Sequence, residues 1–339
     1  MIKVGINGFG RIGRLATRII LTKYQQELDL VCINTSGKIN TAGWMHLFKY
    51  DTAYGKYKGE VIAENDQLVV DGKRIPVLGI REPKDIPWEQ YGVQIVIEAT
   101  GIFLRREELS QHLKGTVKRI IISAPAKDET IPLYIIGVNS DKIGQEEIIS
   151  CASCTTNCAA PIVKVIEENF GINKALMTTI HAYTGDQELL DGSHKDLRRA
   201  RAAAANIVPT TTGAAKSVGE VYPAVKDKFD GLAIRVPVIT GSLTDFTFVT
   251  KKKTNQEEVN SVLIKSSQEN LKGILAVTNE PIVSADIIGL EASSLVDLSL
   301  TKVVDGDLVK VIAWYDNEWG YTNRLIEETV LLAKRLNDS

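Results

Sequence analysis

The stretch VGINGFGRIGRLATRIILTKYQQELDLVCIN, residues 4–34, decides the fold of the N-terminal half. Residues 4–7 form a short apolar run typical of a buried strand, residues 14–23 have helical periodicity, and residues 28–34 form a second apolar run. Parallel neighbouring strands need a long crossover connection, so this strand–helix–strand unit favours a parallel sheet. With further strands expected at 93–97 and 119–122, residues 1 to about 150 predict an open α/β domain.

Three glycines, Gly8, Gly10 and Gly13, separate the first strand from the helix. Glycines at this spacing permit a tight turn, close approach of a pyrophosphate to the backbone, and tight helix–sheet packing. The N-terminus of the helix then presents its N–H groups and the positive end of its dipole to phosphate. The alternative is a purely structural turn, but the strand and helix on either side favour a Rossmann-type dinucleotide-binding domain.

The second half of the chain has a different pattern. Segments 175–183, 231–238, 243–250 and 308–315 are rich in β-branched and aromatic residues, which predicts strands. Helices are expected at 155–170, 255–270 and 322–336, the last with an apolar side and with Lys334 and Arg335 at its end. This part predicts an α+β domain built on a mostly antiparallel sheet. The segment RRARAAAA at 198–205 predicts a solvated helix or loop.

Composition narrows the class of protein. The 339 residues are 44% hydrophobic and 24% charged, as in ordinary globular proteins, and the length suggests two domains. The net charge of −2 gives no electrostatic reason to expect nucleic acid or an anionic membrane as partner. No apolar run is long enough to span a bilayer, and an apolar strand pattern begins at once, so we expect a cytoplasmic protein without a signal peptide.

Three of the four cysteines, Cys151, Cys154 and Cys158, lie within eight positions at a strand-to-helix junction. A helix N-terminus stabilises a thiolate, which suits a nucleophile. His181, at the end of a predicted strand, is a candidate base, although a lone histidine is more often a core residue. The competing interpretation is a zinc or iron–sulfur site, which would need a fourth ligand or an open position. Cys158 can also be a small buried packing residue.

Several motifs resemble the successive signatures of the glyceraldehyde-3-phosphate dehydrogenase family. They are NGFGRIGR (7–14), KYDTAYGK (49–56), ASCTTNCAAP (152–161), TIHAYTGDQ (179–187), DLRRARAAA (196–204), PTTTGAAK (209–216), RVPV (235–238) and WYDNEWGY (314–321). The resemblance covers essentially the whole chain in order. It implies a dinucleotide-binding domain at 1–153, a catalytic domain at 154–320, and a C-terminal helix at about 321–339 that packs back on the first domain.

The resemblance also implies a reaction: phosphorylating, reversible oxidation of D-glyceraldehyde 3-phosphate to 1,3-bisphosphoglycerate with NAD or NADP. Cys154 would attack the aldehyde and form a thioester, with His181 as general base and inorganic phosphate as the final acceptor. The backbone N–H of Cys154 and His181 would hold the oxyanion. The implied site for the substrate phosphate comprises Thr184 and Arg235. The implied site for the attacking phosphate comprises Ser153, Thr155, Arg199, Thr212 and Gly213.

The cofactor residues implied by the resemblance are Gly8, Gly10, Arg11, Ile12, Gly13, Arg81, Thr100, Ser123 and Asn317, the last orienting the nicotinamide amide. Two positions depart from the NAD-specific pattern. Thr35, followed by Ser36, stands where an acidic residue would bind the adenosine ribose, and Ser193 stands where NAD-specific members usually carry proline. A carboxylate would repel the extra phosphate of NADP, whereas hydroxyls can bind it. We therefore expect NADP to be accepted and preferred over NAD.

Family resemblance further implies a homotetramer, in which the RRARAAAA segment packs beside a neighbouring subunit's cofactor, and a role in glycolysis or gluconeogenesis. Erythrose-4-phosphate dehydrogenase, which shares the cysteine and histidine signatures, is the nearest alternative. Thr184 and the intact TTTGAAK favour two phosphate sites and thus the three-carbon substrate. A non-catalytic nucleotide-binding regulator would lack the nucleophile, base or phosphate residues, and none is missing.

Overall fold

The computed structural model describes residues 1–337, and the last two positions of the predicted C-terminal helix, 338–339, lie outside the described residues. The chain divides into two compact units. The first comprises Met1–Tyr134, Lys142–Ala152 and the C-terminal segment that begins at Thr322. The second comprises Ile135–Asp141 and Ser153–Tyr321. The sequence pattern gives no sign that the short segment Ile135–Asp141 belongs with the second unit.

The first unit contains an eight-stranded sheet with strand order β3-β4-β5-β2-β1-β6-β7-β8. Its strands are β1 (Ile2–Asn7), β2 (Leu28–Asn34), β3 (Val61–Glu64), β4 (Gln67–Val70), β5 (Lys73–Leu78), β6 (Ile95–Glu98), β7 (Arg119–Ile122) and β8 (Ile148–Ser150). All neighbours from β5 to β8 are parallel, whereas β3 and β4 pair antiparallel at one edge. The predicted Rossmann-type α/β sheet is confirmed.

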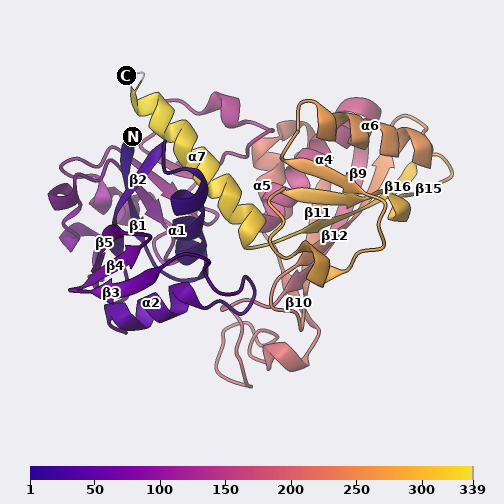
Figure 1. Ribbon diagram of the computed structural model, residues 1–339. Helices are drawn as coiled ribbons and strands as arrows, with labels where there is room; N and C mark the ends of the chain where they lie inside the picture. Colours follow the sequence, from indigo (N-terminus) through magenta and orange to yellow (C-terminus); the bar gives the residue numbers. More distant parts are fainter. Residues whose placement is uncertain (338–339) are drawn as a thin grey trace. The chain divides into compact units, whose positions relative to one another are not determined.

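The helices of the first unit are α1 (Arg11–Lys23), α2 (Thr41–Lys49), α3 (Arg106–Leu109) and most of α7 (Trp319–Asn337). Helix α1 begins three residues earlier than its periodicity predicts, because Gly10 is its N-cap. Helix α7, yellow in Figure 1, lies beside α1. There Lys23 Nζ donates to Asn323 Oδ1 at 3.3 Å, and Tyr24 donates to Glu327 at 3.4 Å.

The second unit also contains an eight-stranded sheet, with order β10-β11-β9-β12-β16-β14-β13 and β15 paired to β16. Its strands are β9 (Ile172–Ala182), β10 (Val208–Thr211), β11 (Phe229–Val236), β12 (Ser242–Thr250), β13 (Leu275–Thr278), β14 (Ser294–Asp297), β15 (Lys302–Val304) and β16 (Leu308–Tyr315). Only the pairs β9–β11 and β13–β14 are parallel. The predicted mostly antiparallel sheet is therefore confirmed.

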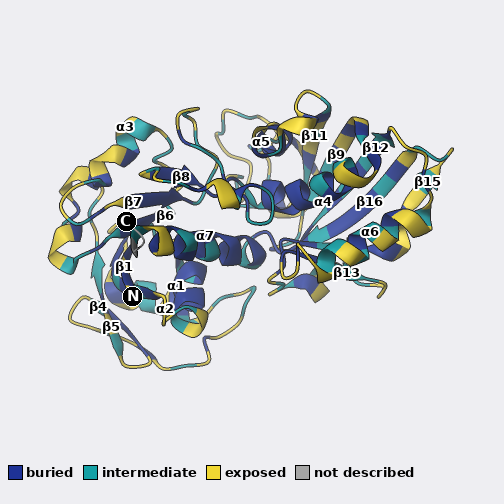
Figure 2. Ribbon diagram, turned by 90° about the horizontal axis from the view of Figure 1, so that it is seen from above, coloured by how far each residue is buried: buried dark blue, intermediate teal, exposed yellow. Residues whose placement is uncertain are grey.

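The helices of the second unit are α4 (Cys154–Phe170), α5 (Ala214–Val221) and α6 (Gln256–Gln268). Helix α4 is buried along most of its length, whereas α6 has an exposed face (Figure 2). The RRARAAAA segment is a loop that ends in one 3₁₀ turn at Ala203–Ala205; the loop is predicted, but it is only partly solvated, because Ala200 and Ala203 are buried. Across residues 1–337, no helix combines the length and apolar character that crossing a membrane requires.

Candidate active site

Cys154 is the first residue of helix α4, and the side chain of Ser153 caps that helix. Ser153 Oγ accepts a hydrogen bond from the backbone N–H of Thr156 at 3.1 Å. The residue before the cap, Ala152, has a φ of +50°, which is uncommon for a residue with a Cβ and costs energy. The chain thus turns sharply into the helix, and the half-buried Cys154 thiol sits where the positive end of the helix dipole favours a thiolate.

His181, near the end of β9, lies against this thiol. Its Nε2 atom is 3.4 Å from Cys154 Sγ, and its Nδ1 atom is 2.7 Å from the carbonyl oxygen of Ala182. Nδ1 lies between an acceptor, this carbonyl, and a donor, Arg235 Nη1 at 2.7 Å, so its two neighbours favour opposite tautomers. In the tautomer that carries the proton on Nδ1, Nε2 can accept the proton of the thiol. His181 is 4% exposed, so its imidazole is shielded from water. The structure therefore brings together the predicted nucleophile and base.

Arg235 joins this pair because β11 runs parallel to β9 in a register that places Arg235 beside His181. Its Nη1 atom is 2.7 Å from His181 Nδ1 and donates to the Ala182 carbonyl at 3.2 Å. Burial and the positive charge of Arg235 lower the pKa of His181 to about 3. Burial raises the pKa of the Cys154 thiol, and the charge of Arg235 partly opposes that rise. Arg235 is thus the cation that favours the thiolate.

Tyr315, at the end of β16, is a site residue for which the sequence interpretation gave no role. Its hydroxyl lies 3.0 Å from Thr155 Oγ1 and 2.7 Å from Thr179 Oγ1, and its ring meets His181 edge-on at 5.9 Å. Burial raises the pKa of this phenol. Tyr315 therefore holds the second residue of α4 and one face of the imidazole. Its place in the motif WYDNEWGY was the only available signal.

Arg199, a residue predicted to bind phosphate, lies in the second unit with Arg235. Arg199 is ion-paired with Asp186 and, at 3.4 Å, with Asp196, and it donates to the carbonyl of Thr211 at 3.4 Å. That carbonyl directly precedes the predicted residues Thr212 and Gly213, which lead into α5. Burial lowers the pKa of Arg235, and the charge of Arg199 lowers it further.

Three buried donors of these two arginines and of Gln187 have no hydrogen-bond partner: Arg235 Nε, Gln187 Nε2 and Arg199 Nε, the last of which is ion-paired with Asp196 at 3.4 Å. Gln187 ends the motif TIHAYTGDQ but was not predicted as a site residue. Its Oε1 accepts a hydrogen bond from the backbone N–H of Thr184 at 3.4 Å. A buried donor without a partner is costly unless a ligand or water satisfies it. Donors of this kind, next to two arginines, suit a bound dianion.

The glycine-rich turn has the geometry that its spacing predicts. A Cβ added at Gly13 would lie 2.0 Å from the carbonyl oxygen of Gly8, and one at Gly8 would lie 2.6 Å from the backbone nitrogen of Thr100. A Cβ at Gly10 would meet no atom within 4 Å, so space lies open there. No side chain caps the N-terminus of α1. These features fit the pyrophosphate of a dinucleotide.

Other predicted cofactor residues of the first unit surround this turn. Arg11 is ion-paired with Asp51 at 2.5 Å. Arg81 is exposed and directly follows Ile80, whose backbone N–H donates a hydrogen bond to Asn34 Oδ1. Thr35 is buried; its hydroxyl donates to the Leu78 carbonyl at 2.8 Å and accepts from Gly37 N–H at 3.2 Å. The Thr35 hydroxyl is therefore already engaged, and Ser36 carries the exposed hydroxyl of that pair.

Two predicted cofactor residues belong to the second unit. Asn317 is buried, and its Oδ1 accepts from Gly241 N–H at 3.2 Å and from Ser242 Oγ at 2.8 Å. These bonds fix the orientation of the amide and leave its NH₂ group to serve as a donor. Ser193 is exposed, in the loop that precedes His194.

Metal-site geometry offers no support for the alternative interpretation of the cysteines. Within residues 1–337, no group of three or more His, Cys, Asp or Glu side chains is placed to hold a metal ion. All four cysteines are among the described residues, and none is in a disulfide bond. Cys158 is fully buried on α4, where its carbonyl accepts from Ser294 Oγ at 2.8 Å, as expected for a packing residue.

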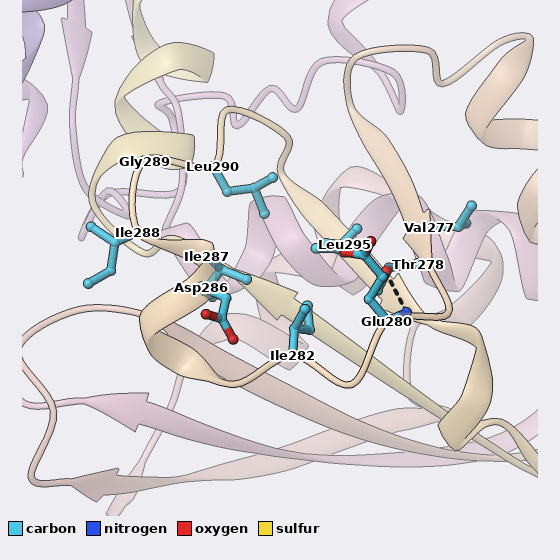
Figure 3. Close-up of a pocket in the computed structure, with 10 residues that line it drawn as sticks. All are labelled: Val277, Thr278, Glu280, Ile282, Asp286, Ile287, Ile288, Gly289, Leu290 and Leu295. Carbon is cyan, nitrogen blue, oxygen red and sulfur yellow. Dashed lines mark hydrogen bonds between the residues drawn. The ribbon is translucent and has the colours of Figure 1, made fainter.

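A separate hollow of about 450 Å³ lies in the second unit (Figure 3). Its lining residues are Val277, Thr278, Glu280, Ile282, Asp286, Ile287, Ile288, Gly289, Leu290 and Leu295. The side chains that line it are apolar apart from those of Thr278, Glu280 and Asp286, and the two carboxylates would repel a phosphorylated substrate. None of the predicted site residues lines this hollow. The candidate active site therefore remains the group formed by Cys154, His181 and Arg235, called here the Cys154 cluster.

Comparison with known proteins agrees with this geometry. Residues 2–106 match the family model described as glyceraldehyde 3-phosphate dehydrogenase, NAD binding domain, and residues 153–317 match that of its C-terminal domain. The glyceraldehyde-3-phosphate dehydrogenase of Streptomyces coelicolor is 53% identical over 338 residues, 99% of each chain. That of Zymomonas mobilis is 48% identical over 99% of each chain. The chloroplastic form B of Pisum sativum is 49% identical over 98% of this chain and 74% of its own.

Fold and site together define a nucleotide-dependent oxidoreductase with a Rossmann-type unit and a cysteine–histidine pair. The matched regions cover most of the chain, and the relatives match over nearly all of it. The chain therefore belongs to the glyceraldehyde-3-phosphate dehydrogenase family.

Proposed function

We propose that this chain catalyses the reversible, phosphate-dependent oxidation of D-glyceraldehyde 3-phosphate to 1,3-bisphosphoglycerate with NAD or NADP. The observation that carries the proposal is the placement of Cys154 Sγ 3.4 Å from His181 Nε2, next to Arg235. A nucleophile, a base that can take its proton, and a cation for an anionic substrate meet in one unit.

In the first step, Cys154 Sγ attacks the aldehyde carbon, and the thiol proton passes to His181 Nε2 and from there to the former carbonyl oxygen, giving a hemithioacetal and a neutral imidazole. The N–H of Cys154, at the N-terminus of α4, and the imidazole of His181 stabilise the negative charge on oxygen. A nicotinamide dinucleotide, when bound, supplies the acceptor for the hydride that leaves the substrate carbon. His181 takes the hydroxyl proton as the hemithioacetal becomes a thioester.

In the second step, an oxygen of inorganic phosphate attacks the thioester carbon. The carbon–sulfur bond breaks, the acyl phosphate leaves, and Cys154 regains its thiol. Thr184 and Arg235 hold the substrate phosphate in this proposal. The attacking phosphate is held by Ser153, Thr155, Arg199, Thr212 and Gly213. Hydroxyl, backbone and guanidinium donors of this kind bind dianions well.

We assign dinucleotide binding to residues 1–153, together with the helix from about residue 321, and catalysis to residues 154–320. The open space at Gly10 and the uncapped start of α1 support the first assignment. The Cys154 cluster supports the second. We also propose that NADP is preferred over NAD. The residue after β2 is the uncharged Thr35, so no carboxylate repels the extra phosphate of NADP there. Ser36 and Ser193 are exposed, and their hydroxyl groups can donate hydrogen bonds to that phosphate.

We further propose a cytoplasmic homotetramer. The loop that contains the RRARAAAA segment exposes four large apolar side chains: Leu189, Leu190, Leu197 and Ile207. Apolar side chains gathered on a loop are typical of protein–protein contact surfaces. None of the four described cysteines is in a disulfide bond, which suits a reducing compartment. Light scattering of the purified protein tests the assembly, and a monomer would contradict it.

The test of the proposed reaction is phosphate-dependent oxidation of glyceraldehyde 3-phosphate, followed with NAD and NADP in parallel, with Cys154→Ser as control. Turnover that requires phosphate and is lost in the control supports the proposal. A higher kcat/KM with NADP supports the cofactor preference, and a higher value with NAD overturns it. Turnover with erythrose 4-phosphate alone would identify the alternative substrate.

A further inference from the structure

A buried carboxylate links the two turns of the proposed dinucleotide site. Glu98, the last residue of β6, is 2% exposed. Its Oε1 accepts hydrogen bonds from the backbone N–H of Thr100, at 2.8 Å, and from the Thr100 hydroxyl. Its Oε2 accepts from Asn7 Nδ2 at 2.5 Å and faces His112 Nε2 at 3.3 Å. Thr100 belongs to one turn, and Asn7 begins the glycine-rich turn.

The direction of the bond from His112 is fixed from the far side of the ring. Trp88 Nε1 lies 3.0 Å from His112 Nδ1, and an indole nitrogen only donates. Nδ1 is therefore the acceptor, and the proton of the neutral ring is on Nε2, where it points to Glu98. His112 is fully buried. Trp88 thus fixes the His112 imidazole as a hydrogen-bond donor to Glu98.

The direction of the bond from Asn7 is fixed in the same way. Asn34 Nδ2 donates to Asn7 Oδ1 at 2.7 Å and to the Ile80 carbonyl at 2.7 Å. Asn34 Oδ1 accepts from Ile80 N–H at 2.9 Å, which sets the orientation of the Asn34 amide. Asn7 Oδ1 is therefore an acceptor, and its NH₂ group must donate to Glu98. Four donors thus converge on one carboxylate, and two of them, Asn7 and His112, are locked as donors by their neighbours.

We propose that Glu98 is a positioning residue that fixes the spacing of the glycine-rich turn and the Thr100 turn for the dinucleotide. The two turns touch closely, since a Cβ at Gly8 would lie 2.6 Å from the nitrogen of Thr100. The backbone carbonyl of Glu98 also accepts from Ser123 N–H at 2.9 Å, which ties a third predicted cofactor residue to the same position. Fully satisfied buried polar networks hold groups in one arrangement. The inference rests on the proposed function.

Glu98→Gln tests the inference, because glutamine has the same shape but replaces one acceptor oxygen with an NH₂ donor. Neither Asn7 nor His112 can reverse its bond without breaking the one to Asn34 or Trp88, so two donors will face each other. We expect the Kd for the preferred dinucleotide, measured by titration calorimetry, to rise at least tenfold. The KM for glyceraldehyde 3-phosphate and the rate of Cys154 alkylation by iodoacetamide should stay within twofold. Glu107→Gln, on the exposed face of α3, is the matched control.

A Kd within twofold of the unsubstituted protein, in a folded Glu98→Gln variant, overturns the inference. Equal losses in dinucleotide affinity, substrate KM and alkylation rate also overturn it, because they indicate general disruption. If Glu98→Gln does not fold, Trp88→Phe removes only the indole donor at the far end of the network. There we expect a Kd at least threefold higher, and an unchanged Kd overturns the inference. If the unsubstituted protein binds neither NAD nor NADP, the proposed function fails instead.

Discussion

The Nε2 atom of His181 lies 3.4 Å from the Sγ atom of Cys154, although 27 positions separate the two residues in the sequence. Cys154 is the first residue of helix α4 and His181 is the last but one of strand β9, so the pair joins the start of a buried helix to the adjacent sheet. A thiol and an imidazole at this separation can exchange a proton directly.

His181→Gln should lower kcat about 10²- to 10⁴-fold, the usual contribution of a positioned general base. The KM for glyceraldehyde 3-phosphate should change little, because the phosphate-binding groups remain. Steady-state kinetics at saturating cofactor measure both constants. His46→Gln, at an exposed position of α2, is the control and should leave kcat unchanged. A small loss of kcat with a large rise in KM would show that His181 binds substrate rather than acting as base.

Arg235→Gln should make Cys154 less reactive at neutral pH. The Arg235 charge lowers the pKa of the thiol, so its removal raises that pKa and reduces the thiolate fraction. The rate of alkylation by iodoacetamide should fall at least about threefold at pH 7, with the pH profile displaced to higher pH. Arg235→Lys retains the charge and should retain most of the rate. An identical profile in both variants would contradict this role.

Tyr315→Phe should weaken the use of phosphate while keeping the ring against His181. The substitution removes the hydroxyl between Thr155 and Thr179 and leaves two buried hydroxyls short of a partner. We expect a loss of about 1–3 kcal/mol in the free energy of unfolding and a higher KM for phosphate. Urea unfolding and kinetics at varied phosphate measure these effects. An unchanged phosphate KM would limit Tyr315 to a role in stability.

Gly13→Ala and Gly10→Ala should separate folding from cofactor binding. A Cβ at Gly13 collides with the carbonyl of Gly8 at 2.0 Å, and backbone cannot easily move aside. The free energy of unfolding of Gly13→Ala should therefore fall by at least about 1–3 kcal/mol. A Cβ at Gly10 meets no atom within 4 Å, so Gly10→Ala should leave the free energy of unfolding unchanged. This variant should nevertheless bind dinucleotide more weakly, because the methyl group enters the open space. Normal dinucleotide affinity in a folded Gly10→Ala variant would place the pyrophosphate elsewhere.

Glu328→Leu should stabilise the protein at neutral and higher pH. Burial raises the pKa of Glu328 well above its usual value, so the folded state holds a proton that the unfolded state releases. Stability therefore falls by up to about 1.4 kcal/mol per pH unit as the pH rises above the ordinary carboxyl range. Denaturant unfolding should show a difference between the variant and the unsubstituted protein that grows as the pH rises above the ordinary carboxyl range. A difference independent of pH would point to packing alone.

The long apolar runs of the chain determine the framework of both sheets by themselves. Strands β2, β7 and β16 have the bounds that the sequence predicts, because each is a continuous β-forming run ended by polar or turn residues. The hairpin strands β3 to β5 and helix α2 were not predicted. They are short, and their stability depends on packing against the rest of the first unit. The glycine spacing determined the turn before α1, because only glycine tolerates backbone contact this close.

The chemistry of the candidate site was decided by tertiary structure. The sequence predicted Cys154 and His181 as a pair, but only the parallel register of β9 with β11 sets Arg235 beside His181. Register depends on how a whole sheet packs, and a shift of one residue would turn Arg235 to the opposite face. The same holds for Tyr315 against Thr155 and for the donors around Glu98. The contacts Tyr315–Thr155 and Asn7–Glu98 join residues 160 and 91 positions apart, so their geometry exists only once the sheets have formed.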